Sequence, residues 1–200
     1  MGVEFLVVLA GYLLGSVPFG LLLGWRRGVD IRERGSRNIG ATNVLRVVGK
    51  AEAAATLVLD GLKGAAPVLA ARVLGTGDPW AAAAGLSAVL GHCFPVFLRF
   101  RGGKGVATAL GALLAALPAV GLVAVLVWLL TALSFRYSSL AALLAAASVP
   151  VAAAAWEGRG PLLAFTLVLA GLIVVRHHEN IRRLWRGEEQ KIGQRAAPAA

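Results

Sequence analysis

The chain has 200 residues, of which 58% are hydrophobic and only 15% are charged, and its mean hydropathy is +0.76. Soluble domains carry charges on about a quarter of their residues, so this composition argues against a soluble protein and indicates a bilayer as the solvent. The net charge of +10 would suit a nucleic-acid-binding protein if the chain were soluble. In a membrane protein the same excess reflects basic residues retained on the cytoplasmic side, so we expect no nucleic acid partner.

Apolar residues form six long runs, separated by polar or basic segments. The runs lie at approximately 3–24, 53–73, 80–98, 105–135, 138–156 and 161–175. A helix needs about 20 apolar residues to cross a bilayer, so most of these runs have the length of one span. The first run has no basic leader and no small-residue cleavage pattern, and we interpret it as a retained span, not as a signal peptide.

The fourth run decides the topology, because its length of about 31 residues is long for one span and short for two. Basic residues stay on the cytoplasmic side, so the basic segments 25–50 and 99–104 should be cytoplasmic and the turn at 75–79 should lie outside. The basic segment 176–191 reaches the cytoplasmic side only if the fourth run is divided into two short spans. Pro118, near the middle of the run, is the expected point of division.

We therefore predict an all-α fold, with seven transmembrane helices in one membrane-embedded domain over residues 1–200. The N-terminus is expected outside and the C-terminus in the cytoplasm, with residues 186–200 as a flexible cytoplasmic tail. Alanine and glycine are frequent in the spans, which predicts closely packed helices because small residues let membrane helices approach one another. This topology brings four polar segments to the inner face.

The first polar segment, residues 35–46, combines glycine with small hydroxyl and amide residues and an arginine. Glycine lets backbone N–H groups approach an anion closely, and consecutive N–H groups can form an anion-binding nest. An ordinary loop between helices has a similar composition and is the alternative. The candidate ligands are Ser36, Asn38, Gly40, Thr42, Asn43 and Arg46.

The second polar segment, residues 91–108, has Gly102, Gly103 and Lys104 directly before an apolar run. Glycine N–H groups and the positive N-terminal end of a helix favour a phosphate, so this segment is a candidate phosphate site. Its spacing differs from that of a P-loop. A basic cytoplasmic turn is the alternative.

The third polar segment, residues 176–184, follows the last apolar run. His177 and Asn180 are three residues apart and share a helix face, and a histidine can act as acid or base near neutral pH. We predict no metal site here, because adjacent histidines on a helix point in different directions and the His-Glu-x-x-His pattern is absent. A basic stop beside the membrane explains some of the arginines.

Two smaller features complete the set. The segment 136–139 is uninformative by itself but adds Ser139 as a candidate ligand. Asp60 and Lys63 are three residues apart within the second run, and ionisable residues in a span usually face a partner or a cavity. Mutual pairing near the inner end of the helix is the simplest account of them, and a function comes second.

The chemistry that suits these residues is the positioning of phosphorylated substrates. The sequence has no acidic cluster that would hold Mg²⁺, which argues against phosphoryl transfer from a nucleotide, and it has no Gly-x-Ser-x-Gly elbow. A reaction of an already activated group needs mostly positioning and anion stabilisation, and it fits better. We predict no cofactor.

Three strings resemble the signature motifs of the bacterial acyl-phosphate-dependent glycerol-3-phosphate acyltransferases. They are Gly-Ser-Arg-Asn-Ile-Gly-Ala-Thr-Asn-Val at 35–44, the strings Gly-His-Cys-Phe-Pro-Val-Phe and Phe-Arg-Gly-Gly-Lys-Gly-Val-Ala-Thr within 91–108, and Arg-His-His-Glu-Asn-Ile-Arg-Arg-Leu at 176–184. They occur in the family's order at compatible spacing, and the similarity covers nearly the whole chain. Arg37 stands where the family usually has a second glycine, so the resemblance does not define the backbone conformation of the first loop.

The resemblance implies a seven-span protein of the bacterial cell (inner) membrane, with its active site on the cytoplasmic face. It implies transfer of a fatty acyl group from acyl phosphate to the 1-hydroxyl of glycerol 3-phosphate, which is the first acylation of phospholipid biosynthesis. The products are lysophosphatidic acid and phosphate. The expected partners are the two small-molecule substrates and the membrane lipids, and we expect a monomer.

Each candidate residue has an expected role in this reaction. Lys104 and Arg46 bind phosphate, and His177 binds the acceptor or takes its hydroxyl proton. A covalent acyl group on Ser36 is chemically feasible but not needed, because acyl phosphate is already a reactive mixed anhydride. Close N–H groups and neutral side chains orient the two phosphates. These come from Gly40, Gly102, Gly103, Asn38, Thr42, Asn43, Ser139 and Asn180.

Two other classes of protein are the alternatives. A transporter or flippase for an anionic metabolite or lipid would want polar groups near the midplane and often an internal repeat. The distinctive polar residues here lie instead at one end of the predicted spans. A non-catalytic membrane subunit would leave the convergence of glycine, lysine, histidine and asparagine unexplained.

Overall fold

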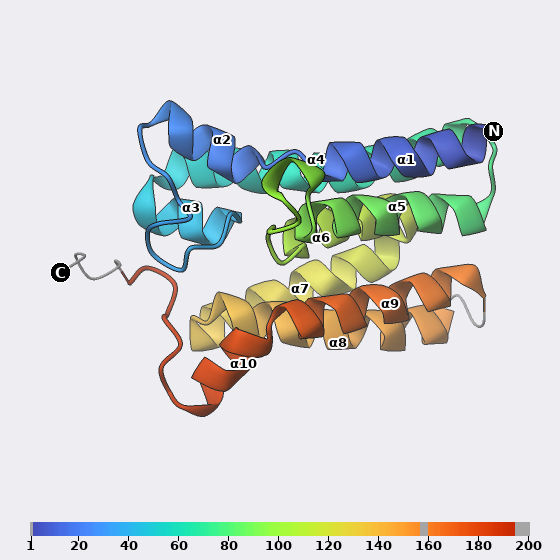
Figure 1. Ribbon diagram of the computed structural model, residues 1–200. Coiled ribbons are helices and arrows are strands. Elements are labelled where there is room, and N and C mark those ends of the chain that lie inside the picture. The colour runs from blue at the N-terminus through green and yellow to red at the C-terminus, as the bar shows by residue number, and fades with distance from the viewer. Residues whose placement is uncertain (1, 157–159, 195–200) are drawn as a thin grey trace.

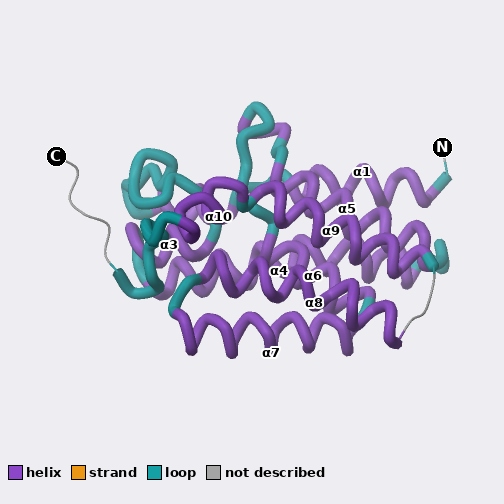
Figure 2. The backbone as a smooth tube through the Cα atoms, turned by 90° about the horizontal axis from the view of Figure 1, so that it is seen from below, coloured by secondary structure: helices purple, strands orange, loops and turns teal. Residues whose placement is uncertain are grey.

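The computed structural model describes residues 2–156 and 160–194 (Figure 1). All regular secondary structure in these two ranges is helical, which confirms the predicted all-α class. The long helices run side by side along one axis (Figures 1 and 2). In chain order the elements are α1 (Val3–Gly15), α2 (Phe19–Arg26), α3 (Ala41–Val47), α4 (Lys50–Val73), α5 (Asp78–Cys93), the 3-10 helix η1 (Val96–Leu98), α6 (Val106–Ala116), α7 (Pro118–Phe135), α8 (Ser138–Trp156), α9 (Pro161–Arg176) and α10 (His178–Trp185).

Five helical stretches in the described residues are long and apolar enough to cross a membrane. They are α1 with α2, α4, α5 with η1, α7, and α8. The pair α9 and α10 passes the same test together, but the two helices meet at an angle of 59°. Helix α6 is apolar but has only 11 residues, a length of about 16 Å that is roughly half of the hydrocarbon core. The structure therefore supports five or six spans, and the seven predicted spans and their orientation stay predictions.

The predicted division of the fourth apolar run at Pro118 is confirmed. Helix α6 ends at Ala116 and α7 begins at Pro118, and Leu117 between them is not helical, with φ −140° and ψ 76°. Proline weakens the interior of a helix because it lacks an N–H group, but it is well suited to the first position of a new one. The chain reverses at this point, and α7 returns along the bundle beside α8 (Figures 1 and 2).

The polar segments gather at one end of the bundle, opposite to the N-terminus (Figure 1). The segments before and after α3, the loop between α5 and α6, the short link between α7 and α8, and α10 with residues 186–194 all lie towards this end. The other end carries the N-terminus and the turn between α4 and α5. The expectation that the candidate site residues share one end of the molecule therefore agrees with the fold.

Small residues bring α4 and α6 into close contact, as the alanine- and glycine-rich composition predicted. A Cβ atom on Gly64 would lie 2.0 Å from the carbonyl oxygen of Thr108, and one on Gly111 would lie 1.9 Å from that of Gly61. Only glycine permits these crossings. They fix α6, and with it the loop that precedes it, against the long helix α4.

The early end of α6 leaves terminal carbonyl groups that have no partner within the helix. Arg72, in the last turn of α4, donates from Nη1 to the carbonyl of Ala115 at 2.7 Å and from Nη2 to that of Ala116. Its positive charge also complements the negative C-terminal end of α6. Arg72 therefore lets α6 stop well short of the length of a full span.

We predict that Arg72→Met destabilises the protein by about 1–3 kcal/mol, because two carbonyl groups lose charged hydrogen-bond donors in apolar surroundings. Thermal unfolding of the purified protein in detergent measures the effect. Arg34→Met, at an exposed loop position, is the matched control and should stay within about 0.5 kcal/mol of the parent. Equal midpoints for the two variants would contradict this role of Arg72.

Candidate active site

A cavity of about 540 Å³ opens among the polar segments at the end of the bundle. Its polar wall comes from all of these segments, and its apolar wall comes from α4, α6, α7 and α8. All predicted site residues line the cavity except Gly102 and Gly103. Those lining it are Ser36, Asn38, Gly40, Thr42, Asn43, Arg46, Lys104, Ser139, His177 and Asn180.

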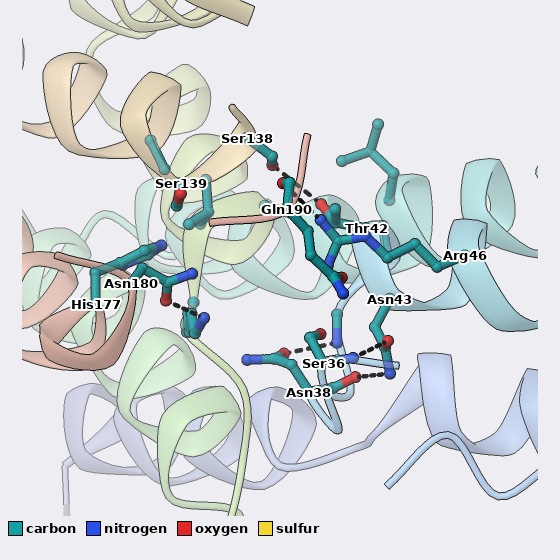
Figure 3. A pocket seen from close by; sticks show the side chains of 18 of the residues that line it. Ser36, Asn38, Thr42, Asn43, Arg46, Ser138, Ser139, His177, Asn180 and Gln190 are labelled. Carbon is teal, nitrogen blue, oxygen red and sulfur yellow. Dashed lines mark hydrogen bonds between the residues drawn. The ribbon is translucent and has the colours of Figure 1, made fainter. Parts of the chain in front are cut away.

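Asn43 holds the first loop in shape. Its side-chain Nδ2 donates to the carbonyls of Ile31, Arg34 and Asn38 at 2.8, 3.2 and 2.9 Å. Its Oδ1 accepts the N–H of Ser36 at 2.9 Å (Figure 3). The side-chain amide is thus occupied by the loop itself, and Asn43 is almost fully buried. Its structural role here is that of a clamp, which differs from the predicted role of a donor to substrate.

Arg37 adopts the left-handed conformation that glycine favours, with φ +58°. The loop therefore keeps a glycine-like backbone although this chain has an arginine at the position, at a cost of roughly 1 kcal/mol. The residue is exposed at the edge of the cavity, and its N–H donates to the carbonyl of Arg34 at 3.0 Å. The departure from the family pattern thus leaves the turn intact.

Gly102 and Gly103 pack on the C-terminal end of α5. Their N–H groups donate to the carbonyls of Cys93 and His92 at 3.2 and 3.0 Å. A Cβ atom on Gly102 would lie 2.2 Å from the carbonyl oxygen of His92, and one on Gly103 would lie 2.1 Å from its Nε2. This corrects the prediction that these N–H groups face a phosphate, because they are used to cap α5 and the two glycines serve close packing.

Arg176 holds the same two residues from the other side. Its Nη2 donates to the carbonyls of Gly102 and Gly103 at 3.1 and 3.0 Å, and its guanidinium lies 5.1 Å from the centre of the Phe94 ring. Residues 102 and 103 are thus held between the C-terminal end of α9 and the C-terminal end of α5. Lys104 follows directly, and its Nζ donates to Oδ1 of Asn180.

His177 stands at the bend between α9 and α10 and is buried. Its Nδ1 lies 2.8 Å from the carbonyl of Ile173. A carbonyl can only accept, so Nδ1 carries a proton. Burial lowers the pKa of His177 to about 4, so the ring is neutral at pH 7 and Nε2 has a free lone pair. The ring is directed towards the other polar side chains of the cavity (Figure 3). His177 is therefore arranged to accept a proton from a bound hydroxyl.

Glu189 is a site residue that the sequence reasoning missed. Its Oε1 accepts hydrogen bonds from Ser139 and Asn180 at 2.7 and 2.6 Å, and its Oε2 accepts one from Arg183 at 2.7 Å. Its side chain is only 7% exposed. Glu188 and Glu189 are two adjacent acids in a basic tail, and they give little signal in the sequence because nothing there indicates that the chain returns to the cavity.

Residues 187–194 fold back over the cavity instead of extending away from it. The carbonyl of Gln190 accepts a hydrogen bond from Arg46 at 3.1 Å, and Ile192 pairs with the backbone and side chain of Arg136. These contacts belong to the segment predicted as a flexible tail, of which residues 195–200 lie outside the described residues. The flexibility itself stays a prediction.

Four cationic side chains line the cavity, Arg37, Arg46, Lys104 and Arg183, and three acidic ones, Asp60, Glu188 and Glu189, so the formal net charge of its wall is +1 (four minus three). Burial and then the nearby Arg183 guanidinium lower the pKa of Lys104 to about 8. Burial alone would raise the pKa of Glu189, but hydrogen bonds from Ser139, Arg183 and Asn180 outweigh it and hold the pKa below its ordinary value. Glu189 is therefore ionised at neutral pH and offsets part of the positive charge.

The chain resembles known proteins over nearly its whole length. The family model for glycerol-3-phosphate acyltransferase matches residues 5–187. A glycerol-3-phosphate acyltransferase of Rubrobacter xylanophilus is 52% identical, with 96% of this chain and 97% of the relative covered. One of Geobacter sulfurreducens is 50% identical, with 94% and 97% covered.

Two solved structures have the same fold. Both are crystal structures of PlsY, an integral membrane glycerol 3-phosphate acyltransferase, in a glycerol 3-phosphate form and a lysophosphatidic acid form. Each is 42% identical to this chain, 96% of each chain is covered, and the TM-scores are 0.92 and 0.89. The chain belongs to the glycerol-3-phosphate acyltransferase family, and it is an acyltransferase with multiple apolar membrane helices.

We predict that Glu189→Gln lowers the free energy of unfolding by about 1–3 kcal/mol, because Arg183 loses its charged partner in a half-buried place. Chemical or thermal unfolding in detergent measures this. The neighbouring Glu188→Gln changes an exposed carboxylate and is the matched control. If both variants unfold like the parent, the hydrogen bonds of Glu189 do not stabilise the fold and this prediction is wrong.

Proposed function

We propose that this member of the glycerol-3-phosphate acyltransferase family transfers a fatty acyl group from acyl phosphate to the 1-hydroxyl of glycerol 3-phosphate. The products are lysophosphatidic acid and phosphate. The observation that carries the proposal is the cavity itself, in which a cationic wall continues directly into an apolar one. Such a site suits substrates that combine phosphate groups with a fatty chain.

The acceptor fits the side of the cavity formed by Lys104, Asn180 and His177. Lys104 and Asn180 are in direct contact, and His177 lies on the same side (Figure 3). An ammonium group and an amide can bind the phosphate of glycerol 3-phosphate. The nearby Nε2 of His177 then meets the hydroxyl that has to lose its proton.

The phosphate of the donor fits the opposite side, formed by the first loop and Arg46. Ser36 and Asn38 lie there together with Thr42, whose hydroxyl is 3.1 Å from that of Ser138 (Figure 3). Small hydroxyl and amide groups can orient the phosphate oxygens while the guanidinium of Arg46 supplies charge. The two phosphates would thereby be held apart on either side of the reacting carbonyl.

The fatty chain of the donor fits the apolar wall. Leu57 of α4, Leu110 of α6 and Trp128 of α7 line this part of the cavity together with Leu129. Leu57 and Leu129 are 52% and 45% exposed on the outer surface of their helices. The apolar wall therefore reaches the lipid-facing surface, which gives a chain dissolved in the bilayer a way in.

The reaction needs only positioning, proton removal and anion stabilisation. The acceptor oxygen forms a bond to the acyl carbon, the bond from that carbon to the phosphate oxygen breaks, and His177 Nε2 accepts the hydroxyl proton. Arg46, on the donor side, stabilises the negative charge that shifts towards the departing phosphate, while Lys104 holds the phosphate of the acceptor. Because acyl phosphate is already activated, no acyl group on Ser36 is required.

We also propose seven spans in the bacterial inner membrane for this chain, with the cavity on the cytoplasmic face and a monomer as the working unit. Basic residues are concentrated in the polar segments at the cavity end, which is the end that the charge rule assigns to the cytoplasm. The short α6 counts as the fourth span in this arrangement.

The purified protein with acyl phosphate and glycerol 3-phosphate should release phosphate only when both substrates are present. Lys104→Ala should lower kcat/KM by about a hundredfold or more, because the cation that holds the acceptor phosphate in place is lost. Lys50→Ala, which removes an exposed lysine at the start of α4 that does not line the cavity, is the matched control. Release that does not depend on the acceptor, or no release at all, would favour the transport alternative.

The KM for glycerol 3-phosphate should rise as the pH increases through about 8. Lys104 loses its positive charge there, whereas an ordinary lysine keeps it to beyond pH 10, and the second ionisation of a phosphate ester is complete below this range. Lys104→Arg keeps its charge and should show a flat profile from pH 7 to 9. If the KM of the parent is equally independent of pH, Lys104 does not bind the acceptor.

A further inference from the structure

Three ionisable side chains lie buried inside the helix bundle, beside the cavity. Asp60 and Lys63 belong to α4, and His92 belongs to the last turn of α5. Their side chains are 3%, 1% and 5% exposed. Lys63 Nζ lies 2.7 Å from Asp60 Oδ1, which confirms the pairing expected from their spacing. Burying an ion pair in a span is costly even when the charges are paired, so such a pair marks a candidate functional element.

Lys63 ties the pair to the break between α1 and α2. Its Nζ also donates to the carbonyl of Val17 at 2.7 Å and lies 5.5 Å from the centre of the Phe19 ring. Val17 and Pro18 separate the two helices, so this carbonyl is outside regular helix. One end of the buried cluster is therefore anchored to the backbone of another span.

Asp60 connects Lys63 to residues 102–104 through His92. The same Oδ1 that meets Lys63 lies 3.7 Å from His92 Nδ1, which is buried without a hydrogen-bond partner among the described residues. The carbonyl of His92 accepts a hydrogen bond from the N–H of Gly103, and the imidazole ring of His92 packs directly on that glycine. A continuous chain of contacts thus runs from Val17 to the residue before Lys104.

Asp60, His92 and Lys104 all line the cavity. We propose that Asp60 and Lys63 are positioning residues, which fix His92 and through it residues 102–104, so that the Lys104 ammonium meets the acceptor phosphate. This inference takes the identity of the ligand from the proposed function. Misplacing a binding group by about 1 Å can cost as much as a hundredfold in rate, so the chain of contacts has consequences that a binding assay can measure.

A purely structural ion pair makes a different prediction. Two buried charges can often be replaced together by neutral residues without loss of stability, whereas removal of one leaves the other unpaired. The double variant Asp60→Asn/Lys63→Met therefore separates the two roles. If the pair is only structural, the double variant regains both stability and function. If the pair positions His92, stability recovers and the binding of the acceptor stays impaired.

The test measures the binding of glycerol 3-phosphate and of inorganic phosphate by titration calorimetry, together with thermal unfolding, on the full chain in detergent. We expect Asp60→Asn and the double variant to bind glycerol 3-phosphate at least about tenfold more weakly than the parent. The KM for acyl phosphate should change less than the KM for glycerol 3-phosphate. A double variant with parental affinity overturns the proposal.

His92→Phe tests whether the effect passes through His92. The variant keeps a ring on Gly103 but loses the nitrogen that faces Asp60. It should weaken acceptor binding as Asp60→Asn does, and the combination of both changes should be no worse than either alone, because they interrupt the same chain. Parental affinity in His92→Phe, or effects that simply add, would overturn the role of His92.

Glu52→Gln is the matched control on the same helix. It breaks the ion pair with Arg27 at the exposed start of α4 and should leave phosphate binding unchanged. Calorimetry needs no turnover, so a parent that binds glycerol 3-phosphate but transfers no acyl group would refute the proposed function and still test this inference. A parent that binds neither probe would overturn the inference, because there would be no anion to position.

Discussion

The contact of residues 102 and 103 with the C-terminal end of α5 is the constraint on which the site depends. The last carbonyls of a helix have no partners within it, and inside a membrane bundle they have to find them in the protein. The N–H groups of Gly102 and Gly103 supply two such partners, while Arg176 binds the carbonyls of the same residues. Lys104 follows these fixed residues, so its position is set by the need to satisfy backbone groups.

Charge balance then connects segments that are distant in the sequence. Glu189 accepts hydrogen bonds from Ser139, Asn180 and Arg183, and thereby joins α8, α10 and the chain beyond α10. Lys104 bonds to the amide oxygen of Asn180 and not to a carboxylate, so its charge stays available for an anion. Glu189 thus offsets the charge of Arg183, while Lys104 stays available for the phosphate that the proposed function assigns to it.

The cavity lies where this polar end meets the apolar bundle, and the short α6 contributes to both. Its crossings with α4 through Gly61, Gly64 and Gly111 hold it in place, and Arg72 satisfies its far end. Leu110 of α6 lines the apolar part of the cavity, and the loop that carries Lys104 leads into the helix. One short helix thus supports the parts of the site proposed for the fatty chain and for the acceptor phosphate.

The sequence by itself determined the helical class, the break at Pro118 and ten of the 29 residues that line the cavity. These features can be predicted because the length of an apolar run, the position of a proline and a local motif each involve only residues that are close together in the sequence. The roles predicted for Gly102, Gly103 and Asn43 were wrong. The N–H groups of the two glycines and the side-chain amide of Asn43 are occupied by hydrogen bonds that form only on folding. Glu189, and the link from Asp60 to His92, were decided by the tertiary structure alone. They join groups far apart in the chain, and only packing tells which buried polar atoms become partners.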